Sequence, residues 1–284
     1  MKSDNVDYTI MADTDSAYFN VTLLVEKMFP KGADDDTIHE FLLKVSNKIK
    51  EEAIQVALNE LYDRCNVFER ALDMKLEAIG SAAVRASKNY IMSLMSLEGI
   101  RYKEPKIKMV GIEAVKSSTP EVCRKFIKES IPYIMSFDRD GLLSHIESSR
   151  KSYFDMEFHE IAKPSSVLDI TKWQEDGYKY KKGTPYHVKA SIAYNKMHND
   201  HKIPETEYQK IQDGDKIRIS HMKKPNPFGG KYFACPDSLP SEFKLDDYID
   251  YETMFNKLCY SPIKSLSDVA KIDLSNKTDI NDFY

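Results

Sequence analysis

Two carboxylates, Asp13 and Asp15, are separated by one residue and lie between two short apolar runs, at residues 8–12 and 16–25. These runs predict a β-hairpin whose tip carries the acids. In a strand with a period of two residues, side chains 13 and 15 lie on the same face. A rigid pair of carboxylates can bind a hard cation such as Mg²⁺, which can organise phosphate oxygens for two-metal nucleotidyl transfer.

The Asp-x-Asp pattern alone leaves several interpretations open. Acidic turns are common on protein surfaces because aspartate hydrogen-bonds its own backbone. A phosphatase with an aspartyl nucleophile would also place Asp-x-Asp after an apolar strand, and sugar-nucleotide transferases use a similar pair to hold a metal. The rest of the chain has to distinguish these kinds of site from a solvent-exposed turn.

The overall composition fits a globular protein. The chain has 284 residues, 42% of them hydrophobic and 30% charged, with a net charge of -4 and a mean hydropathy of -0.51. The chain has no long uncharged apolar run, so the sequence predicts no membrane span. Asp4 and Asp7 precede the first apolar run, which is unlike a signal peptide. Four scattered cysteines without a Cys-x-x-Cys spacing favour reduced thiols in a cytosolic compartment over a structural zinc site.

Charge is distributed unevenly along the chain. Residues 1–77 hold 16 acids and 9 bases, whereas residues 101–128 hold 8 bases and 3 acids, and residues 172–202 hold 7 bases and 3 acids. Charge runs are usually solvated faces. Basic stretches apart from an acidic section also fit a protein that binds a polyanion locally and holds cations elsewhere.

The elements predicted around the acids are mixed. Thr37 and Glu40 form a capping-box pattern that predicts a helix to about residue 63, with one apolar stripe facing the core. Alternating apolar residues predict strands at 72–76, 88–97 and 101–112, the last two joined by a turn.

A second section is expected after Val115. Thr119 is predicted to cap a helix with Pro120 in its first turn, and another helix is expected at about 141–158. Short apolar runs then alternate with loops, and a partly helical segment follows. The runs are at 186–194, 216–220 and 231–235, and the helical segment is at 239–270.

Three ordered landmarks carry a resemblance to a known family. They are Asp13-Thr14-Asp15-Ser16, then Lys88-Asn89-Tyr90 with a basic strand at 101–113, then Lys116-Ser117-Ser118-Thr119-Pro120. The series continues through Tyr186-His187-Val188-Lys189 and Asn226-Pro227-Phe228-Gly229 to the tail Ile280-Asn281-Asp282-Phe283-Tyr284. It resembles the C-terminal part of a family B DNA polymerase of T-even-like bacteriophages over essentially the whole chain.

This resemblance implies an α+β fold and a metal site. Residues 1–115 would be the C-terminal part of a palm, with antiparallel strands and packed helices. Residues 116–275 would be a mainly helical thumb with a small β-subdomain, and residues 276–284 a clamp-binding tail. Asp15 would be the principal catalytic ligand of two Mg²⁺ ions, with Asp13 as an adjacent acid and Glu77 as a strand acid near the metals.

The resemblance also implies residues that bind DNA and a sliding clamp. Primer-end contacts would come from Lys88 and Tyr90, phosphate contacts from Lys116, Ser117, Ser118 and Thr119, duplex contacts from a thumb strand with His187 and Lys189, and clamp contacts from Ile280, Phe283 and Tyr284. The sequence departs from the family at two places. Ser87-Lys88-Asn89-Tyr90 replaces the usual Lys-Lys-Arg-Tyr, and Met11-Ala12 replaces Tyr-Gly before the acids.

Other motifs of the family do not occur in this sequence. It has no Asp-x-x-Ser-Leu-Tyr-Pro-Ser of the first palm motif and no Lys-x-x-x-Asn-Ser-x-Tyr-Gly of the fingers. Because each Mg²⁺ needs about six oxygen ligands, one acidic hairpin cannot hold two ions alone. We therefore expect one chain of a split DNA polymerase, active only with an N-terminal partner chain that carries the exonuclease, the first palm motif and the fingers.

The expected substrates are primer-template DNA and dNTPs, and the expected setting is the cytoplasm of the infected bacterial host, with no membrane partner. The alternative is a catalytically inactive module that binds DNA and a clamp. An aspartyl phosphatase would need a Rossmann-like α/β layout, and this chain instead becomes β-rich and then helical.

Overall fold

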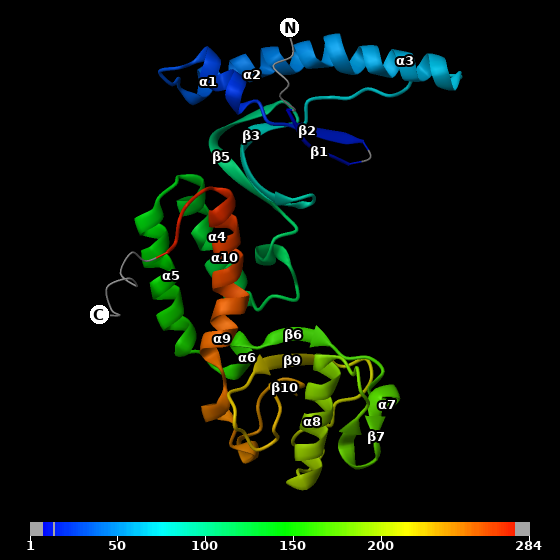
Figure 1. Ribbon diagram of the computed structural model, residues 1–284, viewed down its shortest axis with the longest axis vertical. Coiled ribbons are helices and arrows are strands. Elements are labelled where there is room, and N and C mark those ends of the chain that lie inside the picture. Colours follow the sequence, from blue (N-terminus) through cyan, green and yellow to red (C-terminus); the bar gives the residue numbers. More distant parts are fainter. Residues whose placement is uncertain (1–7, 14, 276–284) are drawn as a thin grey trace. The chain divides into compact units, whose positions relative to one another are not determined.

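The computed structural model describes residues 8–13 and 15–275 (Figure 1). The chain divides into two compact units, Met1–Lys108 and Met109–Tyr284. Helices and antiparallel sheets occur together, so the predicted α+β class is confirmed. The assignment of residues 1–115 to a palm and 116–275 to a thumb stays a prediction.

The first unit contains a two-stranded hairpin, a long helical stretch and a three-stranded sheet of consecutive strands in the order β3-β4-β5 (Figure 1). Its elements are β1 (Thr9–Asp13), β2 (Ser16–Phe19), α1 (Thr22–Met28), α2 (Asp35–Ile49), the π-helical segment η1 (Lys50–Ile54), α3 (Gln55–Cys65), β3 (Ala78–Ala86), β4 (Asn89–Leu97) and β5 (Ile100–Val110).

The acidic hairpin is confirmed, but its second strand is shorter than predicted. Strand β2 ends at Phe19, and α1 replaces the expected strand up to residue 25. The Asn20 side chain accepts a hydrogen bond from the backbone N–H of Thr22 at 3.0 Å, which satisfies a donor of the first helical turn. The following Leu-Leu-Val run does not alternate, so it lacks the strand period.

Helix α2 begins earlier than the capping-box pattern predicts. Asp34, not Thr37, is the N-cap, because its carboxylate accepts the backbone N–H of Thr37 at 2.9 Å. These hydrogen bonds to Thr37 lower the pKa of Asp34. The helical stretch then continues through η1 and α3 to Cys65, close to the predicted end.

The apolar stripe of this stretch does not keep one phase. A π turn absorbs an additional residue, so the inner face advances by one position across η1. Up to the start of η1, the less exposed positions are 45, 46, 49 and 50. From the end of η1, they are 54, 55, 58 and 59. A single apolar stripe over the whole helix would place Val56 and Leu61 in the core, but these side chains are 50% and 46% exposed. The prediction of a single core stripe is therefore wrong at these positions.

Residues 72–76 are irregular, so the strand predicted there is wrong. The Tyr62 hydroxyl donates to the carbonyl of Leu72 at 3.0 Å and accepts from its N–H at 2.8 Å. These two bonds tie the segment to α3 and occupy groups that a strand neighbour would need. The first strand of the sheet is instead β3, which was not predicted from the sequence.

Strands β4 and β5 lie close to their predicted positions. Glu98 and Gly99, with φ of 49° and 79°, form the tight turn that joins them. The β3–β4 register shifts between Ile79 and Gly80. A Cβ on Gly80 would overlap the Ser93 carbonyl oxygen of β4, so this close approach requires glycine.

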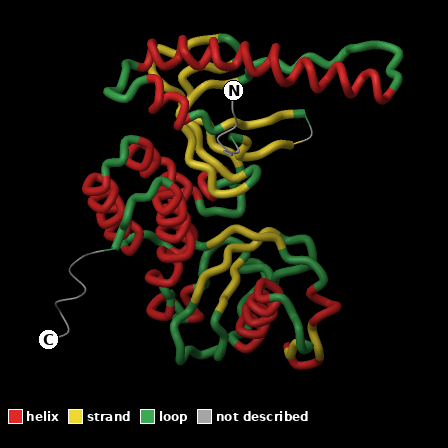
Figure 2. The backbone as a smooth tube through the Cα atoms, turned by 45° about the horizontal axis from the view of Figure 1, so that its top comes forward, coloured by secondary structure: helices red, strands yellow, loops and turns green. Residues whose placement is uncertain are grey.

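The second unit contains a helical group and a β-subdomain in which α8 packs on a three-stranded sheet (Figure 2). The helical group consists of η2 (Glu113–Val115), α4 (Glu121–Met135), α5 (Arg139–Phe154), α6 (Phe158–Ile161), α9 (Tyr251–Phe255), the π-helical η6 (Asn256–Tyr260) and α10 (Ser261–Val269). The sheet, in the order β10-β9-β6, consists of β6 (Lys163–Ser166), β9 (Lys216–His221) and β10 (Tyr232–Cys235). The remaining elements are α7 (Ile170–Trp173), β7 (Gln174–Glu175), η3 (Asp176–Tyr178), β8 (Lys179–Tyr180), α8 (Tyr186–Asp200), η4 (Ser241–Phe243) and η5 (Asp246–Tyr248).

Aromatic side chains form much of the core of the second unit. Tyr153 packs on Phe255 with ring centroids 5.4 Å apart, and Tyr194 packs on Phe243 at 5.6 Å. All four rings are at most 2% exposed, so each contributes most of its apolar surface to folding.

Three cysteines are buried in this unit, and burial raises the pKa of the Cys235 and Cys259 thiols. The fourth, Cys65, is exposed at the end of α3. In the described part of the chain, every helix is too short or too polar to cross a bilayer.

Candidate functional site

The acidic hairpin places the two aspartates in different backbone environments. Asp13 is the last residue of β1 and pairs with Ser16 of β2, and the backbone N–H of Asp15 bonds to the carbonyl of Asp13. Asp15 therefore lies in the turn and is exposed. Because Asp15 is outside the strands, strand alternation does not fix the direction of its side chain and does not place both acids on one face.

Lys88 meets the hairpin at Asp13. Its ammonium lies 2.9 Å from the Asp13 carboxylate, and this hydrogen bond and charge raise the pKa of Lys88. Lys88 stands in the β3–β4 turn with φ of 55° and not on a strand as predicted. The side chains of Lys88 and Asp13 are 71% and 44% exposed, so their pairing orients the groups more than it stabilises the fold.

Tyr90 anchors the same region from β4. Its hydroxyl lies 3.1 Å from that of Tyr18 on β2, and the two rings are 5.8 Å apart. Burial and this hydrogen bond raise the pKa of Tyr90, so it stays a neutral phenol. The Tyr18–Tyr90 contact fixes the hairpin against β4, which brings the acidic turn and Lys88 together.

Glu77 lies immediately before β3 and not within a strand. Its carboxylate pairs with Lys108 of β5 at 3.1 Å, and its charge contributes to the raised pKa of Tyr90. The prediction that Glu77 lies on a strand is therefore wrong, because β3 begins at the next residue, Ala78.

The carboxylates fit part of a Mg²⁺ site. Asp13 and Asp15 supply hard oxygen donors of the kind Mg²⁺ prefers. Across residues 8–13 and 15–275, however, no three His, Cys, Asp or Glu side chains gather as a metal site. Asp13, Asp15 and Glu77 are thus not assembled into one ligand set by this chain, and further oxygens would have to come from phosphates, water or another polypeptide.

The predicted phosphate-binding segment precedes α4 in the second unit. Thr119 is buried, and its backbone N–H bonds to the carbonyl of Lys116 at 3.1 Å. The N-cap of α4 is Pro120, and no side chain makes a capping hydrogen bond there. The prediction of Thr119 as the cap is therefore wrong. Ser117 and Ser118 are exposed. The ammonium of Lys116 lies 3.2 Å from Glu113.

His187 and Lys189 stand on a helix. The prediction of a strand here is wrong, because buried positions recur at 188, 191, 192, 195 and 198 with the helical period in α8. Burial lowers the pKa of His187, and the Lys189 ammonium lies 5.2 Å from the centre of the Tyr180 ring. The predicted clamp-binding residues Ile280, Phe283 and Tyr284 lie outside the described residues.

Sequence reasoning missed functional candidates that are distant along the chain. Tyr18 was part of the recognised hairpin, but its contact with Tyr90 has no local pattern. Lys163 and Lys257 line the same hollow as Lys116, although no motif connects them. Only the tertiary fold brings these side chains together.

Comparisons with known proteins identify the relatives of this chain. No protein-family model matches it. It is 28% identical over 293 residues to the DNA-directed DNA polymerase of Enterobacteria phage T4, covering 98% of this chain and 32% of that protein. The chain resembles phage DNA polymerases. The DNA-directed DNA polymerase of Escherichia phage RB69 is 27% identical over 292 residues with the same coverage, so this chain spans about a third of the length of these polymerases.

Proposed function

We propose that this chain supplies one catalytic metal-binding carboxylate and DNA-binding surfaces to a phage replicative DNA-directed DNA polymerase of family B. The observation that carries the proposal is the contact between Asp13 and Lys88. It joins the acidic hairpin to the lysine predicted to bind the primer end, and the resemblance to phage polymerases extends over 98% of the chain.

The residues of the first unit have distinct proposed roles. Asp15 is the exposed carboxylate available for Mg²⁺, and Asp13 is an adjacent acid oriented by Lys88. Two bound Mg²⁺ ions would stabilise the attacking and leaving oxygens of nucleotidyl transfer. The Tyr18–Tyr90 contact holds the hairpin in position, and Lys88 can exchange its contact with Asp13 for a DNA phosphate or base acceptor.

The rest of the polymerase is proposed to cover the first unit. This unit exposes many large apolar side chains, the extreme case being Phe68 at 107%. The others include Ile10, Phe19, Leu23, Met28, Leu43, Val56, Leu61, Val67, Leu72 and Leu76. Apolar exposure on this scale marks an interaction surface or an aggregation hazard. We assign it to a partner chain that carries the exonuclease, first palm motif and fingers.

Further proposed contacts belong to the second unit and the tail. Lys116, Ser117, Ser118 and Thr119 would bind DNA phosphates, with His187 and Lys189 nearer the duplex along α8. Ile280, Phe283 and Tyr284 would bind a sliding clamp. Primer-template DNA and dNTPs would be the substrates, in the cytoplasm of the infected host.

The test is primer extension by the chain combined with a separately produced remainder of the polymerase. With Mg²⁺, the wild-type pair should extend a primer, and neither polypeptide should do so alone. Asp15→Asn should lower the rate by roughly 100-fold or more, because a metal ligand is lost while the shape is kept. Asp176→Asn, at an exposed position of η3 in the second unit, is the matched control and should leave the rate unchanged. Equal rates for Asp15→Asn and wild type would refute the role of Asp15.

A second candidate is an inactive module that binds DNA and a clamp. The observation in its favour is that Asp13 already binds the Lys88 ammonium. This candidate predicts that the reconstituted pair binds primer-template DNA but does not extend it, and that Asp15→Asn leaves DNA affinity unchanged.

A further inference from the structure

Helix α2 contacts the sheet of the first unit through a polar residue. Among the 15 residues of α2, all of them described, His39 alone is buried, at 8% exposure. Its Nε2 lies 2.8 Å from Oγ of Ser96 in β4, a side chain that is 5% exposed. Because buried polar groups are costly without a hydrogen bond, the docking of α2 depends on this contact.

The same face of β4 also holds the acidic hairpin. Side chains at alternate positions of a strand share a face, and positions 90, 92, 94 and 96 of β4 are all buried. Tyr90 bonds to Tyr18 of the hairpin at the other end of this face. Phe29, which follows α1, packs on Phe41 of α2 with ring centroids 5.4 Å apart. The segment from the hairpin to α2 is therefore fastened to β4 at both ends.

Charged groups of two elements surround the imidazole of His39. Arg101 of β5 donates to the carbonyl of Met95 and pairs with Asp36 of α2, both at 2.9 Å. Strand β4 itself contains no acidic or basic residue. Burial and then the charge of Arg101 lower the pKa of His39, against the opposing effects of Asp36 and Glu40. The docked ring is therefore neutral at neutral pH.

We propose that the hydrogen bond between His39 and Ser96 is a pH-sensitive switch, in which the neutral imidazole holds α2 on the sheet and uptake of one proton releases the helix. A neutral imidazole can exchange one hydrogen bond with a hydroxyl at no cost in charge. A protonated ring would have to keep its charge out of water and beside the Arg101 guanidinium.

The direction of the switch follows from the two states of the helix. When α2 leaves the sheet, His39 reaches water and regains its ordinary pKa of about 6.5. Since the docked ring has a lower pKa, the docking of α2 is fully stable above about pH 6.5 and weakens as the pH falls below it. The hairpin should stay attached, because burial raises the pKa of Tyr90 and its phenol keeps its proton. DNA, metal and a partner chain play no part, so the proposal is independent of the proposed function.

The test measures amide hydrogen exchange of the full chain by mass spectrometry at pH values of about 7.5, 6.5 and 5.5. Each rate is divided by the intrinsic chemical rate at that pH, so that protection reports the opening of each segment. Protection of α2 should fall several-fold between the upper and lower pH, within the limit of about tenfold per pH unit that one proton allows. Strand β4, which lies between two strands, should keep its protection.

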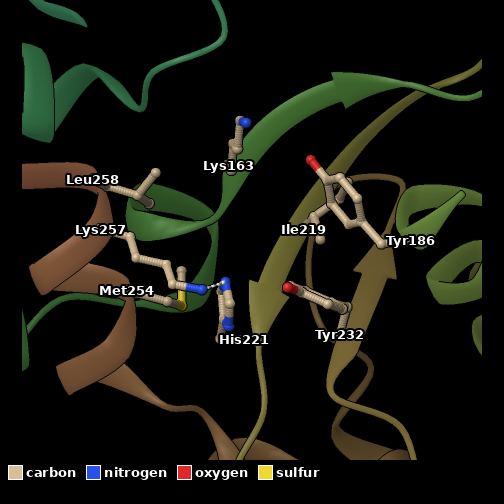
Figure 3. Close-up of a pocket in the computed structure, with 8 residues that line it drawn as sticks. All are labelled: Lys163, Tyr186, Ile219, His221, Tyr232, Met254, Lys257 and Leu258. Atoms are coloured by element: carbon tan, nitrogen blue, oxygen red, sulfur yellow. Dashed lines mark hydrogen bonds between the residues drawn. The ribbon is translucent and has the colours of Figure 1, made fainter.

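Variants identify the group that takes up the proton. His39→Gln keeps an amide that can bond to Ser96 but does not titrate, so protection of α2 should no longer depend on pH. Ser96→Ala removes the partner and should lower the protection of α2 several-fold even at about pH 7.5. His221→Asn is the matched control, because this imidazole belongs to the second unit, 3.4 Å from the Lys257 ammonium (Figure 3). It should leave the pH response of α2 as in wild type.

Two results would overturn the proposal. One is equal protection of α2 in wild type at the highest and lowest pH. The other is a loss of protection in His39→Gln that follows the pH as it does in wild type. If circular dichroism shows that His39→Gln does not fold, Ser96→Ala decides, since protection of α2 equal to wild type would contradict the role of the hydrogen bond. Primer extension is not measured, so either outcome leaves the proposed function to its own test.

Discussion

Phe68 offers the sharpest test of where the proposed partner chain binds. It follows α3 in an irregular segment, and at 107% exposure its ring buries no surface against this chain. Replacement by serine should therefore change the free energy of unfolding of the isolated chain by less than about 0.5 kcal/mol. Any larger effect of Phe68→Ser must come from a partner that contacts the ring.

The expected effect on binding follows from the area that the partner would cover. Full burial of a phenylalanine side chain contributes about 1.5–3 kcal/mol. Since each 1.4 kcal/mol corresponds to about a tenfold change in Kd, Phe68→Ser should weaken binding of the remainder roughly 10- to 150-fold. Most of the change should lie in the dissociation rate.

The assay measures association of the chain with the proposed partner chain by biolayer interferometry, with melting temperature as a check on folding. Phe137→Ser is the matched control, because Phe137 is 69% exposed but belongs to the second unit. Its Kd should equal that of wild type. If Phe68→Ser also binds like wild type, apolar exposure in the first unit does not locate the interface.

Three further changes test other parts of the molecule. Lys88→Met should alter the free energy of unfolding by less than about 0.5 kcal/mol, since its pair with Asp13 is exposed. The same change should weaken primer-template binding. In a titration against NaCl, the slope of log K against log salt concentration should fall by an amount that corresponds to about one phosphate contact. His221→Asn should flatten the pH dependence of stability between pH 6.5 and 4. There the wild-type unfolded chain takes up a proton that the fold excludes, so wild type should lose roughly 1–2 kcal/mol as pH falls through this window, after allowance for screening, as followed by urea unfolding. Gly80→Val should lower stability by about 2 kcal/mol or more in thermal unfolding, because its Cβ would overlap the Ser93 carbonyl, and an unchanged melting temperature would contradict that close approach.

Local signals predicted the elements whose hydrogen bonds are local. The Glu98–Gly99 turn and strands β4 and β5 follow from alternation on both sides of a tight turn. The hairpin at Asp13 follows from the same pattern. In each case the deciding interactions lie within a few residues along the chain.

Predictions failed where distant contacts or a change of period decide the structure. The Tyr62 hydroxyl hydrogen-bonds to both the N–H and the carbonyl of Leu72, and no pattern of alternating residues reveals these two bonds. The alternation at 186–189 is too short to exclude a helix, and the burial of α8 shows its true period. The π turn η1 shifts the inner face by one residue without any sequence signal.

The candidate site was predictable in part for the same reason. Asp13, Asp15 and Lys88 stand in recognisable segments, and the fold brings Asp13 and Lys88 into contact. The hollow lined by Lys116, Lys163 and Lys257 was not predictable, because Lys163 and Lys257 come from separate elements and meet only through packing.

The distribution of thiols gives the chain a built-in attachment point. Cys65 is exposed, whereas Cys123, Cys235 and Cys259 are buried. A maleimide dye should therefore react at one place on the unaltered sequence, with no prior removal of the other cysteines. That place is close in sequence to Phe68, so a polarity-sensitive fluorophore there would report directly when a second polypeptide arrives.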